Sequence, residues 1–367
     1  MIIPNYFPIV GGTENQLRGL VAHLKDDFDI EILTQRYNRL KSEEFVDGIK
    51  VKRIRSIPLL GLLTEFLNAL LIFKYIFKYQ KKIDIIHFHQ GTLLNALISI
   101  LNYKLVGIKS ICKIANSGDK FDLNSINLPF KNQIKKTFIM SINFFVVLNN
   151  DIKKQLNQIH FNSTIKIPNG VNLMKLNSTK FEYPRKIIFS SRLVPQKNID
   201  IILKYLIEID NHLKEFEINI YGNGPEYDKL FSIGKSFQKL KLKLIRDSKK
   251  PYINFKYGDI FINSSSYEGI SNSLLEAMSC GLVPLVSNIP GNLRVVRDGC
   301  NGLFFNLKSK DSFLKSFNLI INSDELYKQI SKKSYKTIEH EFDFRIVVKK
   351  YKLLYKKLIY EDSQNLL

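Results

Sequence analysis

Two series of short apolar runs, each alternating with longer amphipathic segments, constrain the fold of this chain more than any other feature. Continuous apolar runs without polar alternation are typical of parallel strands that are covered on both faces. Their alternation with helices predicts doubly wound α/β domains. The first series of predicted strands is Ile30–Thr34, Ile83–His89, Lys109–Ala115, Phe144–Leu148 and Thr164–Ile167, with helices at Glu14–Lys25 and Gly61–Tyr79.

The second series is Lys186–Ser190, Glu217–Tyr221, Lys241–Ile245, Ile260–Asn263 and Val283–Ser287. Between the two series lies a polar stretch, Pro168–Arg185, and two domains suit a chain of 367 residues. We therefore expect an N-terminal domain over residues 1–168 and a C-terminal domain over residues 169–344. A lysine-rich helix within residues 345–367 can pack back on the first domain. Because open parallel sheets bind ligands beyond the carboxyl ends of their strands, two such sheets would face each other across an active-site cleft.

The cysteine content and the charge narrow the class of protein. Cys112, Cys280 and Cys300 form no CxxC motif, which disfavours a disulfide framework and a zinc site and suits a reducing compartment. No basic, apolar leader opens the chain, so we expect a cytoplasmic protein. The net charge of +21 is spread over both halves of the chain. It favours anionic partners such as a membrane leaflet, nucleic acid or phosphorylated substrates, unless it reflects a lysine-rich coding bias.

The segment Pro58–Tyr79 is close in length and apolar content to a membrane-spanning helix. A buried or half-buried helix is the favoured interpretation, because four residues of the segment are costly in a membrane-spanning helix. These residues are Gly61, Glu65, Asn68 and Lys74. A helix that dips into one leaflet is the alternative, because lysines at positions 74, 78, 81 and 82 follow the apolar part.

Glycines and basic residues stand where predicted strands end and helices begin. Gly11-Gly12-Thr13-Glu14 opens the first helix, and its glycines either let an anion approach backbone N–H groups or make a plain turn. Arg192 and Lys197 follow the first strand of the second series. They either hold a diphosphate or belong to a solvated basic loop. Gly222 and Gly224 follow the next strand and allow either close approach of a ligand or a turn.

The segment that ends at Gly281 combines a strand end, a polar loop and a helix. The loop carries Glu268, and the helix begins near Asn272, carries Glu276 and is expected to stop at Gly281. Free N–H groups and the dipole at the start of such a helix suit a phosphate. The two carboxylates can accept hydrogen bonds from the vicinal diols of a ribose or a hexose.

In this order, the motifs resemble those of the retaining GT-B glycosyltransferases of family 4, whose hallmark is Glu-x7-Glu. The resemblance covers nearly the whole chain. It rests on the Glu268/Glu276 pair, Gly11-Gly12-x-Glu14, Asp84–His89, Pro168–Asn172, the Arg192/Lys197 loop, Gly222-x-Gly224-Pro225 and Asn301-Gly302-Leu303. Three features depart from the pattern. Many relatives have a histidine near the donor sugar, where this chain has Asn116-Ser117-Gly118-Asp119, and we expect these four residues to line the sugar site instead. Few residues precede the glycines, so the first strand is short or begins upstream, and Lys241–Tyr257 lacks the usual Gly-Phe turn for the base.

The resemblance implies a role for individual residues. Arg192 and Lys197 would hold the donor diphosphate and form the catalytic set with Glu268, which would lie near the reacting carbon of the sugar. Glu276 would bind the nucleotide ribose. Further donor contacts would come from Gly12, Asn116, Ser117, Gly222, Gly269, Ile270, Ser271 and Asn272, and acceptor contacts from Glu14 and His89.

The resemblance also implies no metal and no cofactor besides the nucleotide-sugar co-substrate. Asp27-Phe28-Asp29 matches a metal motif of another glycosyltransferase fold, but without supporting context we interpret it as a solvated turn. His87 and His89 face the same side of one predicted strand, and no further ligands for a metal accompany them. Packing is therefore the alternative to a place for His89 beside the acceptor.

The activity implied is that of a metal-independent hexosyl- or other glycosyltransferase that retains the anomeric configuration. The C-terminal domain would bind a nucleoside-diphosphate sugar and the N-terminal domain a saccharide acceptor. The charge and the apolar helix favour a lipid-linked acceptor of surface polysaccharide synthesis (lipopolysaccharide or capsule). The partner surface would be the anionic inner membrane face and not nucleic acid. A GT-B-shaped sugar epimerase or phosphorylase and a non-catalytic polyanion-binding protein are the alternatives.

Overall fold

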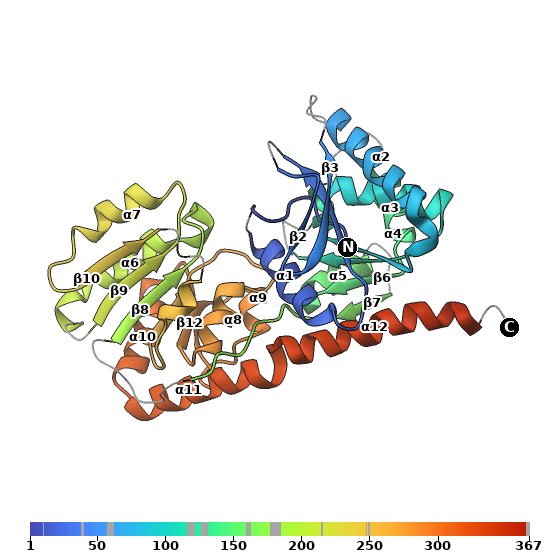
Figure 1. Ribbon diagram of the computed structural model, residues 1–367. Helices are drawn as coiled ribbons and strands as arrows, with labels where there is room; N and C mark the ends of the chain where they lie inside the picture. Colours follow the sequence, from blue (N-terminus) through green and yellow to red (C-terminus); the bar gives the residue numbers. More distant parts are fainter. Residues whose placement is uncertain are drawn as a thin grey trace. The chain divides into compact units, whose positions relative to one another are not determined.

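The computed structural model describes residues 1–9, 11–37, 40–56, 62–115, 122–125, 131–158, 163–176, 185–213, 216–246, 248 and 250–364. The chain divides into two compact α/β units (Figure 1). Unit 1 consists of Met1–Gly170 and Phe344–Leu367, and unit 2 of Val171–Asp343. The chain therefore leaves unit 1 once and returns to it for its last helix.

Unit 2 is built on one parallel sheet of six strands in the order β10-β9-β8-β11-β12-β13. The strands are β8 (Arg185–Ser190), β9 (Phe216–Tyr221), β10 (Lys241–Ile245), β11 (Ile260–Asn263), β12 (Val283–Ser287) and β13 (Leu303–Phe305). The first five confirm predicted strands, and β11 and β12 are buried at every position, as expected for strands covered on both faces. The three-residue β13 was not predicted, because so short a run carries no periodicity.

Six α-helices are described in unit 2. They are α6 (Ile199–Glu208), α7 (Tyr227–Gly234), α8 (Asn272–Ser279), α9 (Pro290–Leu293), α10 (Lys310–Ile321) and α11 (Asp324–Thr337). Serine side chains cap α8, α10 and α11 by accepting a hydrogen bond from the third residue of each helix. Gly281 follows α8 with φ +74°, which confirms the predicted helix stop.

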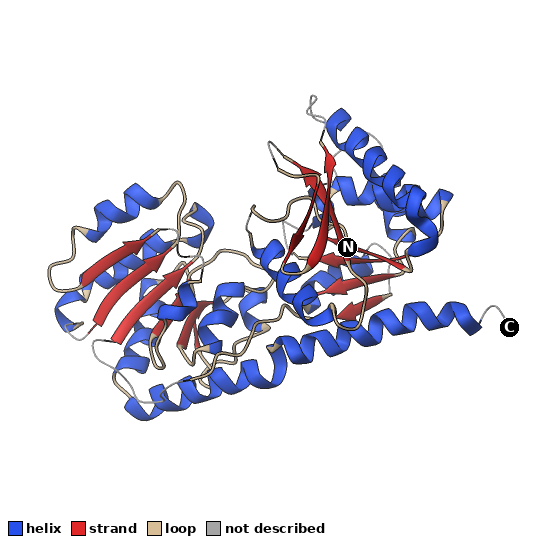
Figure 2. Cartoon of the chain, viewed as in Figure 1, coloured by secondary structure: helices blue, strands red, loops and turns tan. Residues whose placement is uncertain are grey.

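Unit 1 contains two groups of strands (Figure 2). One is the parallel sheet of β4 (Ile85–His89), β5 (Lys109–Ile114), β6 (Phe144–Val147) and β7 (Thr164–Lys166); the other is β1 (Glu31–Arg36), β3 (Ile49–Arg55) and β2 (Glu43–Val46). Ile2 joins the two groups, because it pairs in parallel with both Leu33 and Phe88. Ile2 thus lies between β1 and β4, where a first strand is expected, and it forms isolated bridges to both.

The antiparallel pair of β2 and β3 was not predicted. Its two-residue turn is Asp47-Gly48, with φ of +52° and +81°, the left-handed conformation that such hairpin turns need. An Asp-Gly pair between two strand-like runs is a hairpin signal, and it was overlooked because the flanking runs are rich in charged residues.

The helices of unit 1 are α1 (Gly12–Leu24), α2 (Leu62–Tyr79), α3 (Leu93–Leu105), α4 (Lys131–Met140), α5 (Asn150–Gln158) and α12 (Phe344–Gln364). The buried face of α12 includes Val347, Tyr351 and Leu354 and packs with Leu20 and Leu24 of α1. At the start of α12 the ring of Phe344 lies where a side chain at Gly19 or Gly170 would be. Across the described part of the chain, no helix has the length and hydropathy needed to cross a membrane.

Candidate functional site

The candidate site of unit 2 lies where the order of its strands reverses. From β8 the chain proceeds to β9 and β10 on one side, whereas β11, β12 and β13 follow on the other side of β8. The loops after β8 and β11 therefore leave the carboxyl ends of neighbouring strands in opposite directions. Such a switch point is where open parallel sheets bind their ligands.

Hydrogen bonds tie these two loops together. Asn198, with φ +48°, donates from its Nδ2 to the carbonyl oxygens of Gln196 and Ser264, at 2.9 and 3.0 Å. The hydroxyl of Ser264 donates to the carbonyl oxygen of Lys197 at 2.5 Å. Gln196 Nε2 donates to the carbonyl oxygen of Tyr267 at 2.7 Å. The backbone that carries the candidate residues is thus fixed from both sides.

Lys197 and Glu268 form an ion pair in this double loop, with 2.5 Å between Nζ and Oε1. Both side chains are largely buried, with exposed fractions of 17% and 10%. The hydroxyl of Ser265 donates to the same Oε1 atom. Two residues that lie 71 positions apart thus meet, and their charges are held in place by a neighbouring hydroxyl.

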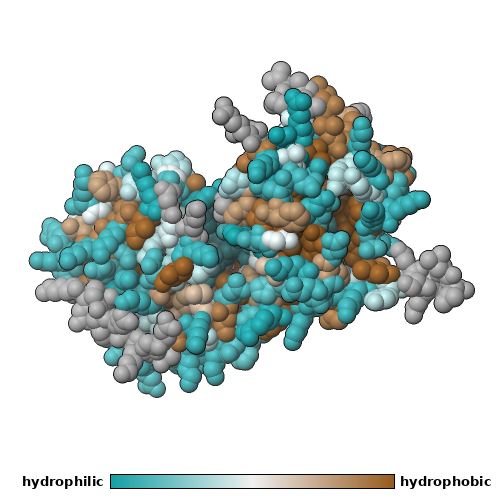
Figure 3. Space-filling view, viewed as in Figure 1, coloured by the Kyte–Doolittle hydropathy of each residue, from teal (hydrophilic) through white to brown (hydrophobic). Residues whose placement is uncertain are grey.

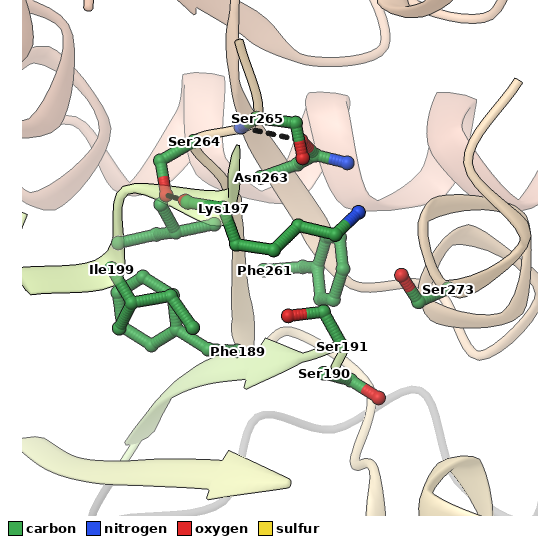
Figure 4. A pocket seen from close by; sticks show the side chains of 11 residues that line it. Phe189, Ser190, Ser191, Lys197, Ile199, Phe261, Asn263, Ser264, Ser265 and Ser273 are labelled. Atoms are coloured by element: carbon green, nitrogen blue, oxygen red, sulfur yellow. Dashed lines mark hydrogen bonds between the residues drawn. The ribbon is translucent and has the colours of Figure 1, made fainter. Parts of the chain in front are cut away.

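A small, open pocket lies beside this pair. Lys197 extends across it in Figure 4, and the hydroxyls of Ser190, Ser191 and Ser273 stand around it. Phe189 and Phe261 form part of its wall. A cation and several hydroxyls above an apolar floor suit a polar, anionic ligand.

Arg192 is exposed two residues after the end of β8, and it is not among the residues that line this pocket. The next residue, Leu193, is fully buried, and its N–H donates to the carbonyl oxygen of Asn223 at 2.8 Å. A Cβ at Gly222 (φ +149°) would overlap the carbonyl oxygen of Ser191, and a Cβ at Gly224 (φ +152°) that of Leu193. These two glycines are therefore required for packing between loops, whether or not Gly222 also contacts a ligand.

The helix α8 begins directly after the Glu268 loop. Gly269, Ile270 and Ser271 are buried, and Asn272 at the first helical position is partly exposed. Glu276 lies one turn further along the helix, and burial raises the pKa of its carboxyl from 4.5 to about 7. Hydrogen bonds donated by a ligand would stabilise the ionised form of this carboxyl, which burial alone disfavours.

The candidate residues of unit 1 are less concentrated. Gly12, at the start of α1, is exposed and Glu14 is partly exposed, so both are accessible. His89 has no exposed surface; its ring lies against that of His87, with 4.1 Å between the ring centroids, and burial lowers the pKa of both rings. Its position supports packing and not contact with an acceptor. Asn116 and Ser117 lie outside the described residues.

The serines of the double loop were missed as individual candidates. Ser264, Ser265 and Ser266 directly follow a fully buried strand, which is a signal that the sequence offers, because hydroxyls at such a strand end can hydrogen-bond loops or ligands. Ser265 orients Glu268, and Ser266 accepts a hydrogen bond from Asn198.

The described residues contain no group of three or more metal-ligating side chains. Asp27 of the Asp27-Phe28-Asp29 segment forms an ion pair with Lys352 of α12, with 2.5 Å between Oδ2 and Nζ. The structure thus gives this segment a packing partner in unit 1.

Comparisons with known proteins match both parts of the chain. Residues 10–175 match the family described as Glycosyltransferase Family 4, and residues 174–337 match Glycosyl transferases group 1. Together the two matches extend over both units.

Individual relatives agree with these matches. An uncharacterized glycosyltransferase of Methanocaldococcus jannaschii is 24% identical over 98% of each chain. The UDP-Gal:alpha-D-GlcNAc-diphosphoundecaprenol alpha-1,3-galactosyltransferase of Escherichia coli is 31% identical over 52% of this chain and 53% of its own length. Anabaena HepE, solved with UDP-glucose, has a TM-score of 0.73 at 14% identity over 97% of this chain and 99% of HepE. The last similarity shows a shared fold.

Proposed function

We propose that the chain is a retaining, metal-independent GT-B glycosyltransferase that uses a nucleoside-diphosphate sugar, because residues 10–175 match Glycosyltransferase Family 4 and residues 174–337 match Glycosyl transferases group 1. The observation that carries the donor assignment is the Lys197–Glu268 pair at the switch point of unit 2. It joins a cation for a leaving diphosphate to a carboxylate for the sugar in one fixed loop structure.

The leaving diphosphate is held by three positive groups. Arg192 supplies an exposed planar fork, Lys197 a point charge, and α8 the positive end of its helix dipole. Together they neutralise charge where a metal ion would otherwise do so. Losing one such contact raises the barrier by roughly 2–4 kcal/mol, by analogy with the removal of an oxyanion-hole donor.

The two carboxylates hold the two ends of the donor. Glu276 accepts hydrogen bonds from the ribose hydroxyls, which favour its ionised form and offset the desolvation of that carboxylate. Glu268 accepts from the transferred sugar near its reacting carbon. The backbone of Gly269–Asn272 and of Gly222 completes the donor contacts within unit 2.

Transfer proceeds by substitution on one face of the sugar. The bond between the anomeric carbon and the diphosphate oxygen breaks, and the acceptor oxygen forms its bond to the same face of that carbon. The proton of the acceptor hydroxyl moves to the departing diphosphate oxygen. Because no enzyme nucleophile takes part, catalysis rests on positioning and on charge stabilisation in the leaving group.

The acceptor is a lipid-linked saccharide of surface polysaccharide synthesis, presented at the cytoplasmic face of the inner membrane. The similar E. coli enzyme is named for a diphosphoundecaprenol-linked sugar. The net charge of +21 also favours an anionic membrane surface. Glu14, which is partly exposed at the start of α1, is the acceptor contact that the described part of unit 1 offers.

Calorimetry with UDP, GDP, ADP and CMP tests the donor site on the wild type and on Arg192→Ala. One diphosphate should bind in the micromolar range to the wild type and at least tenfold more weakly to the variant. Arg55→Ala, which removes an exposed arginine of unit 1, is the matched control and should bind like the wild type. Absence of binding to all four nucleotides, or equal binding by Arg192→Ala, would refute the donor site.

A further inference from the structure

The helix α2 exposes an apolar stripe along its outer side. Five large apolar side chains on it are 36% to 54% exposed: Leu62, Leu63, Phe66, Leu70 and Phe77. The opposite side is buried in unit 1 through Ala69, Ile72 and Ile76. The stripe is therefore not needed for the core and remains uncovered in the folded unit.

The neighbouring helices extend this stripe. α2 contacts α3, and α3 contacts α4. Tyr103 and Leu105 of α3 and Met140 of α4 are each at least half exposed. Figure 3 shows apolar side chains gathered on the surface of this part of unit 1. We refer to the exposed residues of α2, α3, α4 and the turn Gln80–Lys82 as the α2–α4 surface.

The α2–α4 surface is strongly basic. Its segments contain eight lysines, at positions 74, 78, 81, 82, 104, 131, 135 and 136, and a single acidic residue, Glu65. Burial raises the pKa of Glu65, which disfavours its charged form. Tyr75 of α2 donates a hydrogen bond to Glu31, and the carboxylate of Glu31 is already paired with Lys50, with 3.2 Å between Oε1 and Nζ.

Basic helices on the described surface of unit 2 are different. α11 carries lysines at positions 328, 332, 333 and 336, but also Asp324 and Glu325, and it exposes no large apolar residue. Of the large apolar residues exposed in the described part of unit 2, Phe231, Leu293 and Leu319 lie on three different helices, and Ile253 and Tyr267 lie outside its α-helices. Among the described helices, α12 also exposes Leu353 and Tyr360 beside lysines, but the α2–α4 surface has eight exposed large apolar residues where α12 has two.

We propose that the α2–α4 surface docks the protein on an anionic lipid bilayer, with α2 lying in the plane of the interface. Apolar side chains that enter the acyl boundary and lysines that contact anionic headgroups are the two attractions that hold interfacial helices. A protein partner would need exposed acidic groups opposite eight lysines, whereas an anionic leaflet supplies them everywhere. The inference gives a location to the proposed transfer reaction, but docking itself requires no donor.

Sedimentation of the full chain with vesicles tests the surface. Vesicles of phosphatidylcholine mixed with phosphatidylglycerol should bind the protein, and phosphatidylcholine alone should bind it more weakly. Each lysine at an anionic surface contributes about fivefold to partitioning, so three substitutions should weaken binding roughly a hundredfold. The test variant is Lys78→Gln/Lys81→Gln/Lys82→Gln, and the control is Lys328→Gln/Lys332→Gln/Lys336→Gln in α11, which removes the same charge and should bind like the wild type.

A second pair of variants tests the apolar stripe. Phe66→Gln/Leu70→Gln should lower partitioning at least tenfold. The matched control is Phe231→Gln/Leu319→Gln, which removes one exposed phenylalanine and one exposed leucine from unit 2 and should leave partitioning unchanged.

Three outcomes would overturn docking through this surface. In the first, the wild-type protein does not bind anionic vesicles. In the second, the control variants lose as much vesicle binding as the test variants. In the third, the wild type is a dimer in solution and only Phe66→Gln/Leu70→Gln makes it a monomer. Nucleotide calorimetry on the same proteins separates this proposal from the donor site. Vesicle binding without nucleotide binding would support the docking surface and contradict the proposed donor site. Nucleotide binding without vesicle binding would support the donor site and contradict the docking surface.

Discussion

The two units differ in what their surfaces expose. Unit 1 contains 29 basic and 15 acidic residues, whereas unit 2 contains 26 and 19. Of the seventeen large apolar side chains that are exposed among the described residues, twelve belong to unit 1, and eight of these are on α2, α3 and α4. Unit 2 instead concentrates its unusual features in the two loops at its switch point, where polar groups are fixed by hydrogen bonds.

This difference suggests a division of work between the units. A small, charged donor is recognised by few groups in fixed positions, which a rigid polar site provides. An acceptor anchored in a bilayer is reached from an extended surface, which requires area and charge more than fixed geometry.

The largest expected effect is on catalysis in unit 2. Lys197→Ala and Arg192→Ala should each reduce turnover at least about a hundredfold, because each removes a charge-assisted contact to the leaving diphosphate. Turnover is measured with the donor that calorimetry selects. The α2 variant Lys78→Gln/Lys81→Gln/Lys82→Gln should keep its turnover on a soluble acceptor. Near-normal turnover in both Lys197→Ala and Arg192→Ala would contradict a donor site in unit 2.

The next largest effect concerns how rigidly the loops of unit 2 are packed. Gly222→Ala should destabilise the protein by about 3 kcal/mol, because the methyl group meets the carbonyl oxygen of Ser191 in a backbone conformation that L-residues avoid. Gly299→Ala is the control. It also has positive φ, at +65°, but open space around it, so it should cost only about 1 kcal/mol. Urea unfolding measures both, and equal losses would show that strain and not loop packing decides the effect.

Much of the fold could be predicted because the relevant patterns are local. A buried strand such as β12 is apolar at every position, and the run itself shows it. The carboxyl ends of those strands then indicate which loops gather at one edge. Arg192, Lys197 and Glu268 could each be placed in a loop after such a strand, whereas their grouping into one set came from the resemblance to the family 4 glycosyltransferases.

Contacts over long sequence distances could not be predicted. The Lys197–Glu268 ion pair depends on β8 and β11 being neighbours, which the order of strands decides and no local pattern records. The burial of His89 depends on the segment at Ile2, whose carbonyl oxygen accepts from the His89 N–H at 2.9 Å, and on the packing of His87. The exposed stripe of α2 was also ambiguous, since an apolar helix does not indicate which of its sides a neighbour will cover.

A smaller effect with a characteristic pH dependence is expected at Glu276. Its pKa is about 7 in the folded protein and near 4.5 in the unfolded chain, so the folded state binds more protons between these values. Stability of the wild type should therefore fall as pH rises from about 4.5 to 7. Glu276→Gln removes this loss and should be more stable than the wild type by about 2 kcal/mol above about pH 7, with little difference near pH 4.5.

Glu341→Gln is the comparison of opposite sign. Arg297 and Arg294 lower the pKa of the Glu341 carboxyl below its ordinary value, despite an opposing effect of burial. The stability that this ion pair contributes is present above the unfolded pKa and is lost as pH falls through the folded one, so Glu341→Gln should be destabilising at neutral pH. Urea unfolding at several pH values distinguishes the two, and parallel pH profiles would refute the desolvation of Glu276. Calorimetry on Glu276→Gln should also show weaker nucleotide binding if this carboxylate holds the ribose.

The smallest effect tests how α12 is held in unit 1. Tyr355→Phe should cost about 1 kcal/mol, because the phenol hydroxyl lies 2.7 Å from His87 Nδ1 and its loss leaves that buried nitrogen without a partner. Tyr351 is one turn earlier on the same helix, is buried to the same degree, and its hydroxyl meets no hydrogen-bond partner among the described residues. Tyr351→Phe should therefore be neutral or stabilising. Thermal unfolding of the pair measures the difference directly, and a Tyr351→Phe loss as large as that of Tyr355→Phe would show that the hydroxyls of α12 contribute by packing and not through the bond to His87.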